Sequence, residues 1–395
     1  MMKKSNLLLA LIFIITFAGG FISGVLFSTN DTQRETSESQ KSRKTEQAPI
    51  SQKNPKPKTT PEPAQPKVLI GYVQDFRDPN TVHYSQLTHV IFSFAHPTKD
   101  GRLLLHGETA INHLRTMVQK AHQHHTKAML AIGGWYHIQG GESYEYFKTA
   151  ISQPASRTRL VNELVGMADR EKLDGIDIDF EHPRSEADAK NLAAFTKALS
   201  DKLHAKDKEL SIAVYSKIHS VTGTEVTSVV FEPSMFRDVD HVNIMAYDGQ
   251  WDGEYNAANL SPYPFTEHIV NYWANLFEEN GISKEKLVLG VPFYAQPEDL
   301  SAGQLSYAAI VGSNPANAGH DVVTMNGTTY HYNGVATIQK KTKLALDHSF
   351  GGMMLWEAGH DAAGHQSLTS AISEVLKKST TEQEQAKQYT VKSGK

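Results

Sequence analysis

The chain has 395 residues with 39 basic and 43 acidic side chains, and its net charge of −4 carries no signature of a nucleic-acid-binding protein. It contains no cysteine, which excludes disulfides, thiolate catalysis and cysteine-bound zinc. The length allows one large domain or two smaller ones.

The N-terminus carries a hydrophobic run. Two lysines precede an uncharged stretch from Leu7 to Phe27, which at about 1.5 Å per residue just crosses a hydrocarbon core of about 30 Å. We predict a signal-anchor segment over residues 1–28, with its positive flank in the cytoplasm. A cleaved signal peptide is the alternative, because Gly19-Gly20 interrupts the run. Both interpretations make the membrane a partner of this segment and place the main domain in the periplasm or at the cell surface.

The next segment, residues 29–66, is rich in Ser, Thr, Gln, Lys, Glu and Pro, and Ile50 is its only large aliphatic residue. Such a composition cannot bury a core, so we predict a disordered, solvated linker. Residues 378–395 form a second polar stretch, which we expect to be a frayed tail. Residues 67–377 remain as one globular region.

The globular region alternates short apolar runs with amphipathic helical patterns. Alternating strands and helices predict a parallel sheet, and eight units in about 310 residues fit an α/β fold of the closed (β/α)8 barrel (TIM barrel) type. An open doubly wound sheet is the alternative, but the first run is not followed by a glycine-rich phosphate loop. The runs are Val68–Val73, His89–Ala95, Ala128–Ile132, Leu173–Glu181, Leu210–Tyr215, His241–Tyr247, Leu287–Tyr294 and Gly352–Trp356.

The fourth run holds the most informative stretch, Asp-Gly-Ile-Asp-Ile-Asp-Phe-Glu, which begins at Asp174. Alternation at period two places Asp177, Asp179 and Glu181 on one strand face and the apolar side chains on the other. Three carboxylates on one face repel one another and lose hydration if buried, so a sequence selected for stability alone would place aliphatic residues there. An exposed face of an edge strand is the alternative, but the apolar back of the strand disfavours it.

Other unusual residues follow the ends of neighbouring runs, where barrel enzymes carry their chemistry. Aromatic rings stack on sugar faces and carboxylates bind or cleave at the polar edges, so together they indicate a sugar site. A single aromatic residue of this kind is best explained as an ordinary core residue. Several of them clustered at one end of the barrel indicate a functional site. The residues are Gly134, Trp135, Met245, Tyr247, Asp248, Tyr294, Trp356 and Glu357.

These residues resemble the family 18 glycoside hydrolases, the chitinase family, in a bacterial form. The family signature D-x-x-D-x-D-x-E is met by Asp174, Asp177, Asp179 and Glu181. The resemblance covers residues 67–377 and includes Gly-Gly-Trp, Met-x-Tyr-Asp and Gly-Gly-x-Met-x-Trp motifs at the third, sixth and eighth runs. It implies hydrolysis of chitin or another N-acetylglucosamine-containing oligosaccharide. We expect a monomer that uses neither metal nor cofactor.

The resemblance also implies a substrate-assisted mechanism with retention of configuration. Glu181 would protonate the glycosidic oxygen and later activate water. The substrate's acetamido carbonyl would attack the anomeric carbon, while Asp179 would hold the acetamido N–H and Asp177 would share a proton with Asp179. Tyr247 would donate its hydroxyl to the acetamido oxygen, and Trp356 would form the floor of the pocket.

The remaining site residues are assigned by the same resemblance. Tyr72 would support Asp177. The other contacts with substrate would come from Asp248 and Trp135, which face the leaving-group sugar, and from Gly134, Met245 and Tyr294. Independently of the resemblance, packed like charges raise the pKa of at least one acid, as a proton donor at neutral pH requires. Their titrations are coupled, so a pKa belongs to the cluster.

Two positions depart from the family pattern. Ala131 stands where the family often has a serine that helps to hold the second aspartate, and we expect the change to alter the proton balance at Asp177. Ala295-Gln296 replaces a frequent Gly-Arg and removes a substrate contact. Residues 298–335 are too short for the extra domain that deepens the cleft in some relatives, so we predict an open groove suited to cutting within chains.

Several histidines allow two interpretations. His122, His124 and His125 indicate a solvated helix end, with metal binding as the alternative. By its parity His182 is expected to face the helix layer, and tuning of the neighbouring Glu181 is the alternative. His360 and Asp361 either line the groove or belong to a solvated loop. A divalent cation between Asp177 and Asp179 is disfavoured, because the rim lacks a phosphate-binding loop.

Three functions stay open at this point. The first is a chitinase acting on β-1,4-linked N-acetylglucosamine. The second is an endo-β-N-acetylglucosaminidase acting on N-glycans or peptidoglycan. The adjacent Tyr247 and Asp248 weakly favour chitin over these two substrates. The third is a chitin-binding lectin without activity. Such lectins usually lose the final glutamate of the signature, and Glu181 is present.

Overall fold

The structure, a computed structural model, describes residues 66–393. The predicted anchor, residues 1–28, and the predicted linker, apart from Pro66, lie outside the described residues. Among residues 66–393, no helix combines the length and the apolar character that crossing a membrane requires.

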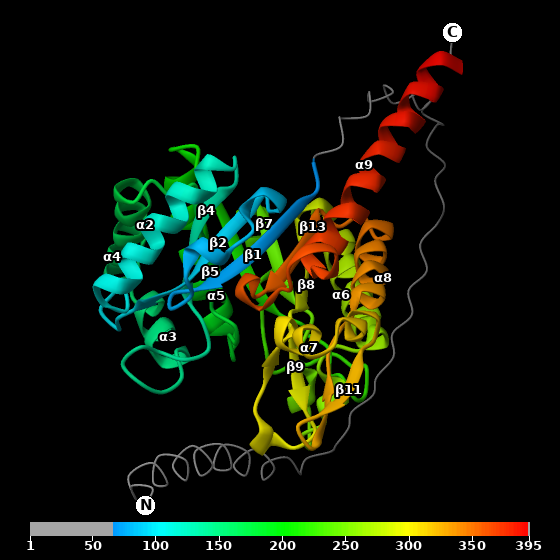
Figure 1. Ribbon diagram of the computed structural model, residues 1–395. Helices are drawn as coiled ribbons and strands as arrows, with labels where there is room; N and C mark the ends of the chain where they lie inside the picture. The colour runs from blue at the N-terminus through cyan, green and yellow to red at the C-terminus, as the bar shows by residue number, and fades with distance from the viewer. Residues whose placement is uncertain (1–65, 394–395) are drawn as a thin grey trace, which may run out of the picture. The chain divides into compact units, whose positions relative to one another are not determined.

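Eight parallel strands form a closed barrel, which confirms the predicted (β/α)8 fold (Figure 1). Closure is visible in the pairing of β1, which bonds to β2 on one side and to the last strand, β13, on the other. The barrel strands are β1 (Val68–Gln74), β2 (His89–Pro97), β4 (Lys127–Gly133), β5 (Gly175–Asp179), β6 (Glu209–Tyr215), β7 (His241–Met245), β8 (Leu287–Pro292) and β13 (Gly352–Trp356). A short strand, β3 (Leu103–Leu104), extends β2.

Helices cover the outside of the barrel (Figure 1). The helix that follows the acidic stretch, α5 (Glu186–His204), is capped by Ser185, whose side chain accepts a hydrogen bond from the backbone N–H of Asp188. A stripe of leucines and Phe195 on this helix faces the strands. The predicted boundary at residue 377 falls inside the last helix, which continues to Ser393. The helices are α2 (Gly107–Gln123), α3 (Tyr144–Ser152), α4 (Pro154–Arg170), α5 (Glu186–His204), α6 (Tyr263–Glu279), α8 (Val335–Asp347) and α9 (Leu368–Ser393).

A second, smaller sheet follows β8. It has four antiparallel strands, of which β9 begins two residues after β8 ends. The segment 298–335 was predicted to be too short for a full extra domain. It adds three strands and one α-helix to the barrel. The open groove that was inferred from its length remains a prediction. The elements are β9 (Tyr294–Pro297), β10 (Leu305–Ser306), α7 (Tyr307–Ser313), β11 (Val322–Met325) and β12 (Thr328–His331).

The strands are buried on both faces, as expected for a parallel sheet covered by helices. Outward-facing aliphatic side chains form one core with the helices. A separate inner cluster fills the barrel and includes Tyr72, Tyr247, Tyr294 and Met354. Three of the predicted site residues are therefore part of the inner packing and are held rigidly by it.

Candidate active site

The acidic side chains predicted from the fourth run gather at the carboxyl end of β5. Asp177 and Asp179 lie on the same strand face and are 0% and 4% exposed. Glu181 lies two residues beyond the end of the strand, and its side chain is 17% exposed. The predicted strand Leu173–Glu181 was too long, because after Asp179 the backbone leaves the ladder and Phe180 packs under the helices against Phe147, with ring centroids 4.9 Å apart.

Asp177 receives three hydrogen bonds. The Tyr72 hydroxyl donates to Oδ2 at 2.9 Å, and on Oδ1 the Ser211 hydroxyl donates at 2.5 Å and the Asn243 amide at 3.3 Å. Asn243 also donates to the Tyr72 hydroxyl at 3.0 Å. Burial raises the pKa of Asp177 to about 7, although these three donors act in the opposite direction.

The family resemblance placed Tyr72 beside Asp177, but the sequence analysis missed Ser211 and Asn243. The signal was a polar residue within an otherwise buried apolar run, at Ser211 in β6 and at Asn243 in β7. Ala131 is the register partner of Asp177 on β4, and Ser211 is its partner on β6. The hydroxyl that the family often carries on β4, at the position of Ala131, is supplied here by Ser211 on β6.

Asp179 has an oxygen, Oδ1, that is buried and has no hydrogen-bond partner among the described residues. Burial, followed by the charges of Glu181 and Asp177, raises the pKa of Asp179 well above its usual value. An unsatisfied buried oxygen costs about 1–3 kcal/mol, so the arrangement favours any group that would bond to it.

Among Asp177, Asp179 and Glu181, Glu181 is the acid nearest to solvent. Burial, followed by the charge of Asp248, raises the pKa of Glu181 to about 8. Asp248 is fixed by the Tyr294 hydroxyl, which donates to Oδ1 at 2.5 Å, and by the Gln250 amide at 2.9 Å. At neutral pH Glu181 therefore carries a proton that it can donate.

His182 does not face the helix layer, and that expectation was wrong. Its ring lies between Trp135 and Tyr215, with centroid distances of 5.2 and 5.1 Å, and its Nδ1 is 3.7 Å from Oε2 of Glu181. The alternation that assigned its side stops where β5 ends, at Asp179. Burial lowers the pKa of His182 to about 4, so the ring is neutral at neutral pH.

Aromatic residues surround the acids. Trp356 packs against Tyr72 and Phe94 at centroid distances of 5.6 and 5.8 Å, and Tyr247 meets Tyr294 at 6.3 Å. The Tyr247 hydroxyl lies 3.9 Å from the sulfur of Met354. Trp135 is 50% exposed at the rim, and Met245 packs partly buried against the inner cluster.

Gly134 is required by its surroundings. Its φ is +78°, and a Cβ atom there would meet the Phe94 ring at 2.9 Å. Gly133, with φ of +121°, lies against the backbone oxygen of Asp179, which a Cβ atom would approach to 2.1 Å. The Gly-Gly pair lets the Trp135 loop pass directly over the strand that carries the acids.

Other predicted groups lie outside the acid cluster. Asp361 accepts hydrogen bonds from Ser367 and from backbone N–H groups at the start of α9, so its role is to cap a helix. His360 bonds to the buried Glu357 at 3.3 Å. His122 pairs with Asp174 at 2.8 Å, and His124 stacks on Tyr84, so the histidine triplet does not converge on one point.

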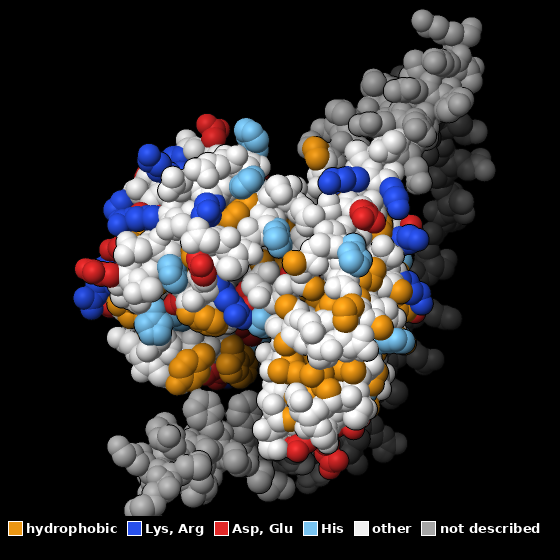
Figure 2. All heavy atoms as spheres, viewed as in Figure 1, with side chains coloured by type: hydrophobic (Ala, Val, Ile, Leu, Met, Phe, Trp, Pro, Cys, Tyr) orange, Lys and Arg blue, Asp and Glu red, His pale blue; other side chains and the backbone are white. Residues whose placement is uncertain are grey.

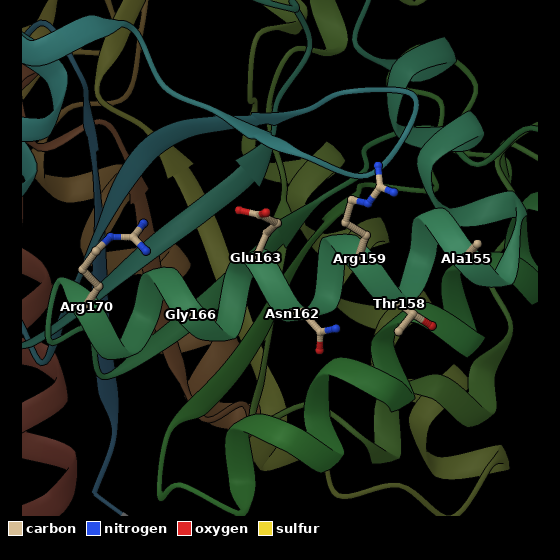
Figure 3. Close-up of a pocket in the computed structure, with 7 residues that line it drawn as sticks. All are labelled: Ala155, Thr158, Arg159, Asn162, Glu163, Gly166 and Arg170. Carbon is tan, nitrogen blue, oxygen red and sulfur yellow. The ribbon is translucent and has the colours of Figure 1, made fainter.

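Two of the hollows on the surface of the described residues differ in character. In Figure 2 the surface is indented between the part that contains α3 and the part that contains β9 and β11, and hydrophobic side chains lie on both sides. Figure 3 shows a shallow hollow on α4, where Arg159 is already paired with Asp100 at 2.8 Å. This second hollow lies in the helix layer and contains no strand-end residue. Its lining residues are Ala155, Thr158, Arg159, Asn162, Glu163, Gly166 and Arg170.

Comparison with known proteins identifies what the barrel is similar to. A family model described as glycosyl hydrolases family 18 matches residues 68–361. The chain is 31% identical to a chitinase-like effector of Moniliophthora roreri, over 57% of this chain and 56% of that protein. It is 26% identical to endochitinase 1 of Metarhizium robertsii, over 66% of this chain and 67% of that protein. The chain thus spans little more than half of the first relative and about two thirds of the second.

The solved structures agree on the fold. A family 18 chitinase from the chitin utilization locus of Flavobacterium johnsoniae superposes with a TM-score of 0.65, covering 79% of this chain and 94% of that one. The two sequences are 23% identical, so this similarity is evidence for the fold alone.

Proposed function

This chain belongs to family 18 of the glycosyl hydrolases, and from that membership we propose that it cleaves β-1,4-linked N-acetylglucosamine polymers such as chitin, with retention of configuration. The observation that carries the proposal is the state of Glu181. This residue is present, partly exposed at the rim, and its pKa of about 8 keeps it protonated at neutral pH. A positioned general acid contributes about 10²–10⁴ in rate.

The first step is protonation of the glycosidic oxygen by Glu181. The carbonyl oxygen of the substrate's own acetamido group attacks the anomeric carbon, the bond to the leaving sugar breaks, and a cyclic oxazolinium ion forms. Glu181, now ionised, accepts a proton from a water molecule that opens this ion. Two displacements at the same carbon give net retention.

Asp179 holds the attacking acetamido group. Its Oδ1 is the buried oxygen without a partner among the described residues, and the acetamido N–H is a donor that fits it. Asp177 lies behind it with both oxygens bonded to protein donors, and it shares the proton of the pair as positive charge develops. The Tyr247 hydroxyl, whose nearest partner is a weakly accepting sulfur, is available to the acetamido oxygen.

Aromatic rings hold the sugar chain. Trp356, fixed between Tyr72 and Phe94, forms the floor under the sugar that is cleaved, and Trp135, held against His182, stacks on the leaving-group side. Tyr136, which follows Trp135 in the chain, and Trp251, three residues after Asp248, are 59% and 44% exposed and offer further rings to a sugar chain. A surface of this kind favours binding along a chain and cutting within it.

The substrate polymer and the activity are tested together. The full-length protein is assayed on a fluorogenic chitobioside, and its products from chitohexaose, an N-glycopeptide and peptidoglycan are compared by mass spectrometry. We expect Glu181→Gln to lower kcat about 10²–10⁴-fold. Glu186→Gln, an exposed carboxylate at the start of α5, is the matched control and should leave kcat unchanged.

Four outcomes would contradict this function. Undiminished turnover by Glu181→Gln would exclude the general acid. A product of inverted anomeric configuration, observed by NMR, would exclude the oxazolinium ion. Binding of chitohexaose without turnover would favour a lectin, and turnover restricted to the glycopeptide or to peptidoglycan would identify an endo-β-N-acetylglucosaminidase.

We further propose that the enzyme is a monomer exported across the membrane and held there by residues 1–28. The support is the uncharged run from Leu7 to Phe27 behind two lysines. Protease treatment of intact cells should degrade the catalytic domain, and the domain should fractionate with membranes. Recovery of the intact protein from the cytosol would contradict the export.

A further inference from the structure

The amino-terminal end of the barrel, opposite the catalytic acids, carries a polar cluster that the proposed function does not use. Four strands begin with a polar residue: His89 begins β2, Lys127 begins β4, Glu209 begins β6 and His241 begins β7. These residues are far apart in the sequence and meet because the barrel closes. Gly175, the first residue of β5, has no side chain to fill the space, and a Cβ atom there would lie 2.5 Å from the backbone oxygen of Glu209.

Three of these side chains converge on one point. Nε2 of His89 lies 2.8 Å from Oε2 of Glu209, and Nε2 of His241 lies 3.9 Å from the same oxygen. One ligand atom from each residue can be chosen so that all three lie within 4.8 Å of one another. The side chains of His89, His241 and Glu209 are 4%, 14% and 23% exposed, so the point is enclosed but open to solvent beside the carboxylate.

The hydrogen bonds around His89 direct its Nε2 at the carboxylate of Glu209. The Thr88 hydroxyl lies 2.8 Å from Nδ1 of His89 and 3.1 Å from the carbonyl oxygen of Leu69, and it can donate its proton to either. When it donates to Leu69, it accepts from Nδ1, and Nε2 of His89 then presents a lone pair toward Oε2 of Glu209, which is 2.8 Å away. A metal ion can bind to both of these atoms in place of the proton that they share in the other tautomer.

We propose that His89, His241 and Glu209 bind a divalent zinc-like cation, with water as the fourth ligand. Two imidazoles and one carboxylate are an established ligand set for Zn²⁺, whose bonds of about 2.0–2.2 Å place ligand atoms about 3.3 Å apart. Opening the shortest contact by about half an ångström and rotating the His241 ring inward reaches that geometry. Lys127 binds the other oxygen, Oε1, and so orients the carboxylate while leaving Oε2 for the metal.

The bound ion would cross-link strands of the barrel. It would join the second, fifth and sixth strands of the barrel across its base, and it is at the opposite end of the strands from Glu181. Binding of the ion should therefore raise the stability of the folded protein by mass action and leave the hydrolysis rate unchanged. The inference is independent of the proposed function, because the readouts are metal content and stability.

The test uses the full-length protein, stripped with a chelator and then titrated with ZnCl₂. We expect one equivalent to bind, a rise in Tm of several degrees, and ligand-field absorption in the visible when Co²⁺ replaces Zn²⁺. Glu209→Gln and His241→Gln should each lower the affinity at least tenfold. His122→Ala, which removes an exposed histidine of the triplet His122, His124 and His125, is the control and should bind as the wild type does.

Several results would overturn the proposal. Binding that survives Glu209→Gln and His241→Gln would place the ion elsewhere, and loss of binding in His122→Ala or Glu181→Gln would place it at the surface or among the catalytic acids. If a variant fails to fold by circular dichroism, the wild-type Co²⁺ spectrum decides, since a protein without ligand-field bands has no such site. In that case the contact between His89 and Glu209 is a hydrogen bond alone.

Discussion

The hydroxyl of Ser211 donates a 2.5 Å hydrogen bond to Oδ1 of Asp177, from the strand opposite to the one that carries Ala131. This bond supports the ionised form of an acid whose pKa burial has raised to about 7. Ser211→Ala should therefore raise the pKa of Asp177 further. A hydrogen bond to a charged group is worth about 1.5–3 kcal/mol, so we expect kcat/KM to fall by about one order of magnitude or more.

The measurement is the pH profile of kcat/KM, whose acidic limb should move to higher pH in Ser211→Ala. Adding Ala131→Ser restores a hydroxyl at the other register partner of Asp177 and should recover part of the loss. Ser200→Ala is the control, because that buried hydroxyl donates at 2.6 Å to the backbone of Asp238 outside the site. A profile that shifts equally in both variants would show that stability, and not the proton balance, had changed.

Asp248 sets the alkaline limit of activity through Glu181. Its negative charge is the second cause, after burial, that raises the pKa of Glu181 to about 8. Glu181 donates a proton only below its pKa, so activity should fall as the pH rises through about 8. Asp248→Asn removes the charge, lowers the pKa of Glu181, and should shift the alkaline limb of kcat toward lower pH.

The control for this prediction is Asp299→Asn, which removes a carboxylate on the small second sheet that bonds only within its own turn. Its alkaline limb should coincide with that of the wild type. An unchanged limb in Asp248→Asn would mean that burial alone sets the pKa of Glu181.

His182 supports the rim by packing and not by charge. Its pKa of about 4 leaves the ring neutral above about pH 5, and the ring fills the space between Trp135 and Tyr215. His182→Phe should therefore keep KM within about twofold and leave the alkaline limb in place, since one partly buried aromatic ring replaces another. His182→Ala should raise KM severalfold because Trp135 loses its support.

Steady-state kinetics on chitohexaose between pH 5 and 9 separates the two roles. If His182→Phe moved the alkaline limb as far as Asp248→Asn does, the imidazole would be tuning Glu181 directly across the 3.7 Å contact. If only His182→Ala raises KM and His182→Phe does not, the role of His182 is to pack against Trp135.

Lys341 makes the stability of the protein depend on pH. The side chain is fully buried in α8, where its ammonium donates to the backbone oxygen and hydroxyl of Ser261 and to Oδ1 of Asn333. Burial lowers its pKa to about 7, against the opposing effect of Asp321, whereas in the unfolded chain it is about 10.4. Between these values the unfolded state binds more protons, so raising the pH favours the folded state.

Lys341→Met removes that dependence. The free energy of unfolding of the wild type, relative to the variant, should increase between pH 7 and 9 by up to about 1.4 kcal/mol per pH unit. Urea denaturation at both pH values measures the difference, with the exposed Lys343→Met as the matched control. A difference that does not change with pH would show that the ammonium stays charged in the folded protein.

Much of the fold could be predicted because its determinants are local. Most barrel strands are short apolar runs followed by an amphipathic helix, and this alternation predicts a parallel sheet. The ends of elements were less predictable. The fourth strand stops at Asp179, and the last helix continues through a polar stretch to Ser393. Tertiary packing determines where such elements end, and the composition of a short stretch of sequence carries no information about that packing.

The sequence by itself determined the acids of the site, because a period of two within five residues places Asp177 and Asp179 on one face whatever surrounds them. Only the tertiary structure decided that Ser211 and Asn243 bond to Asp177, and that His182 packs against Trp135. It also brought His89, Glu209 and His241 together at the base of the barrel. These partners lie on strands far apart in the chain, and their contacts exist only because closing the sheet fixes every strand against the others.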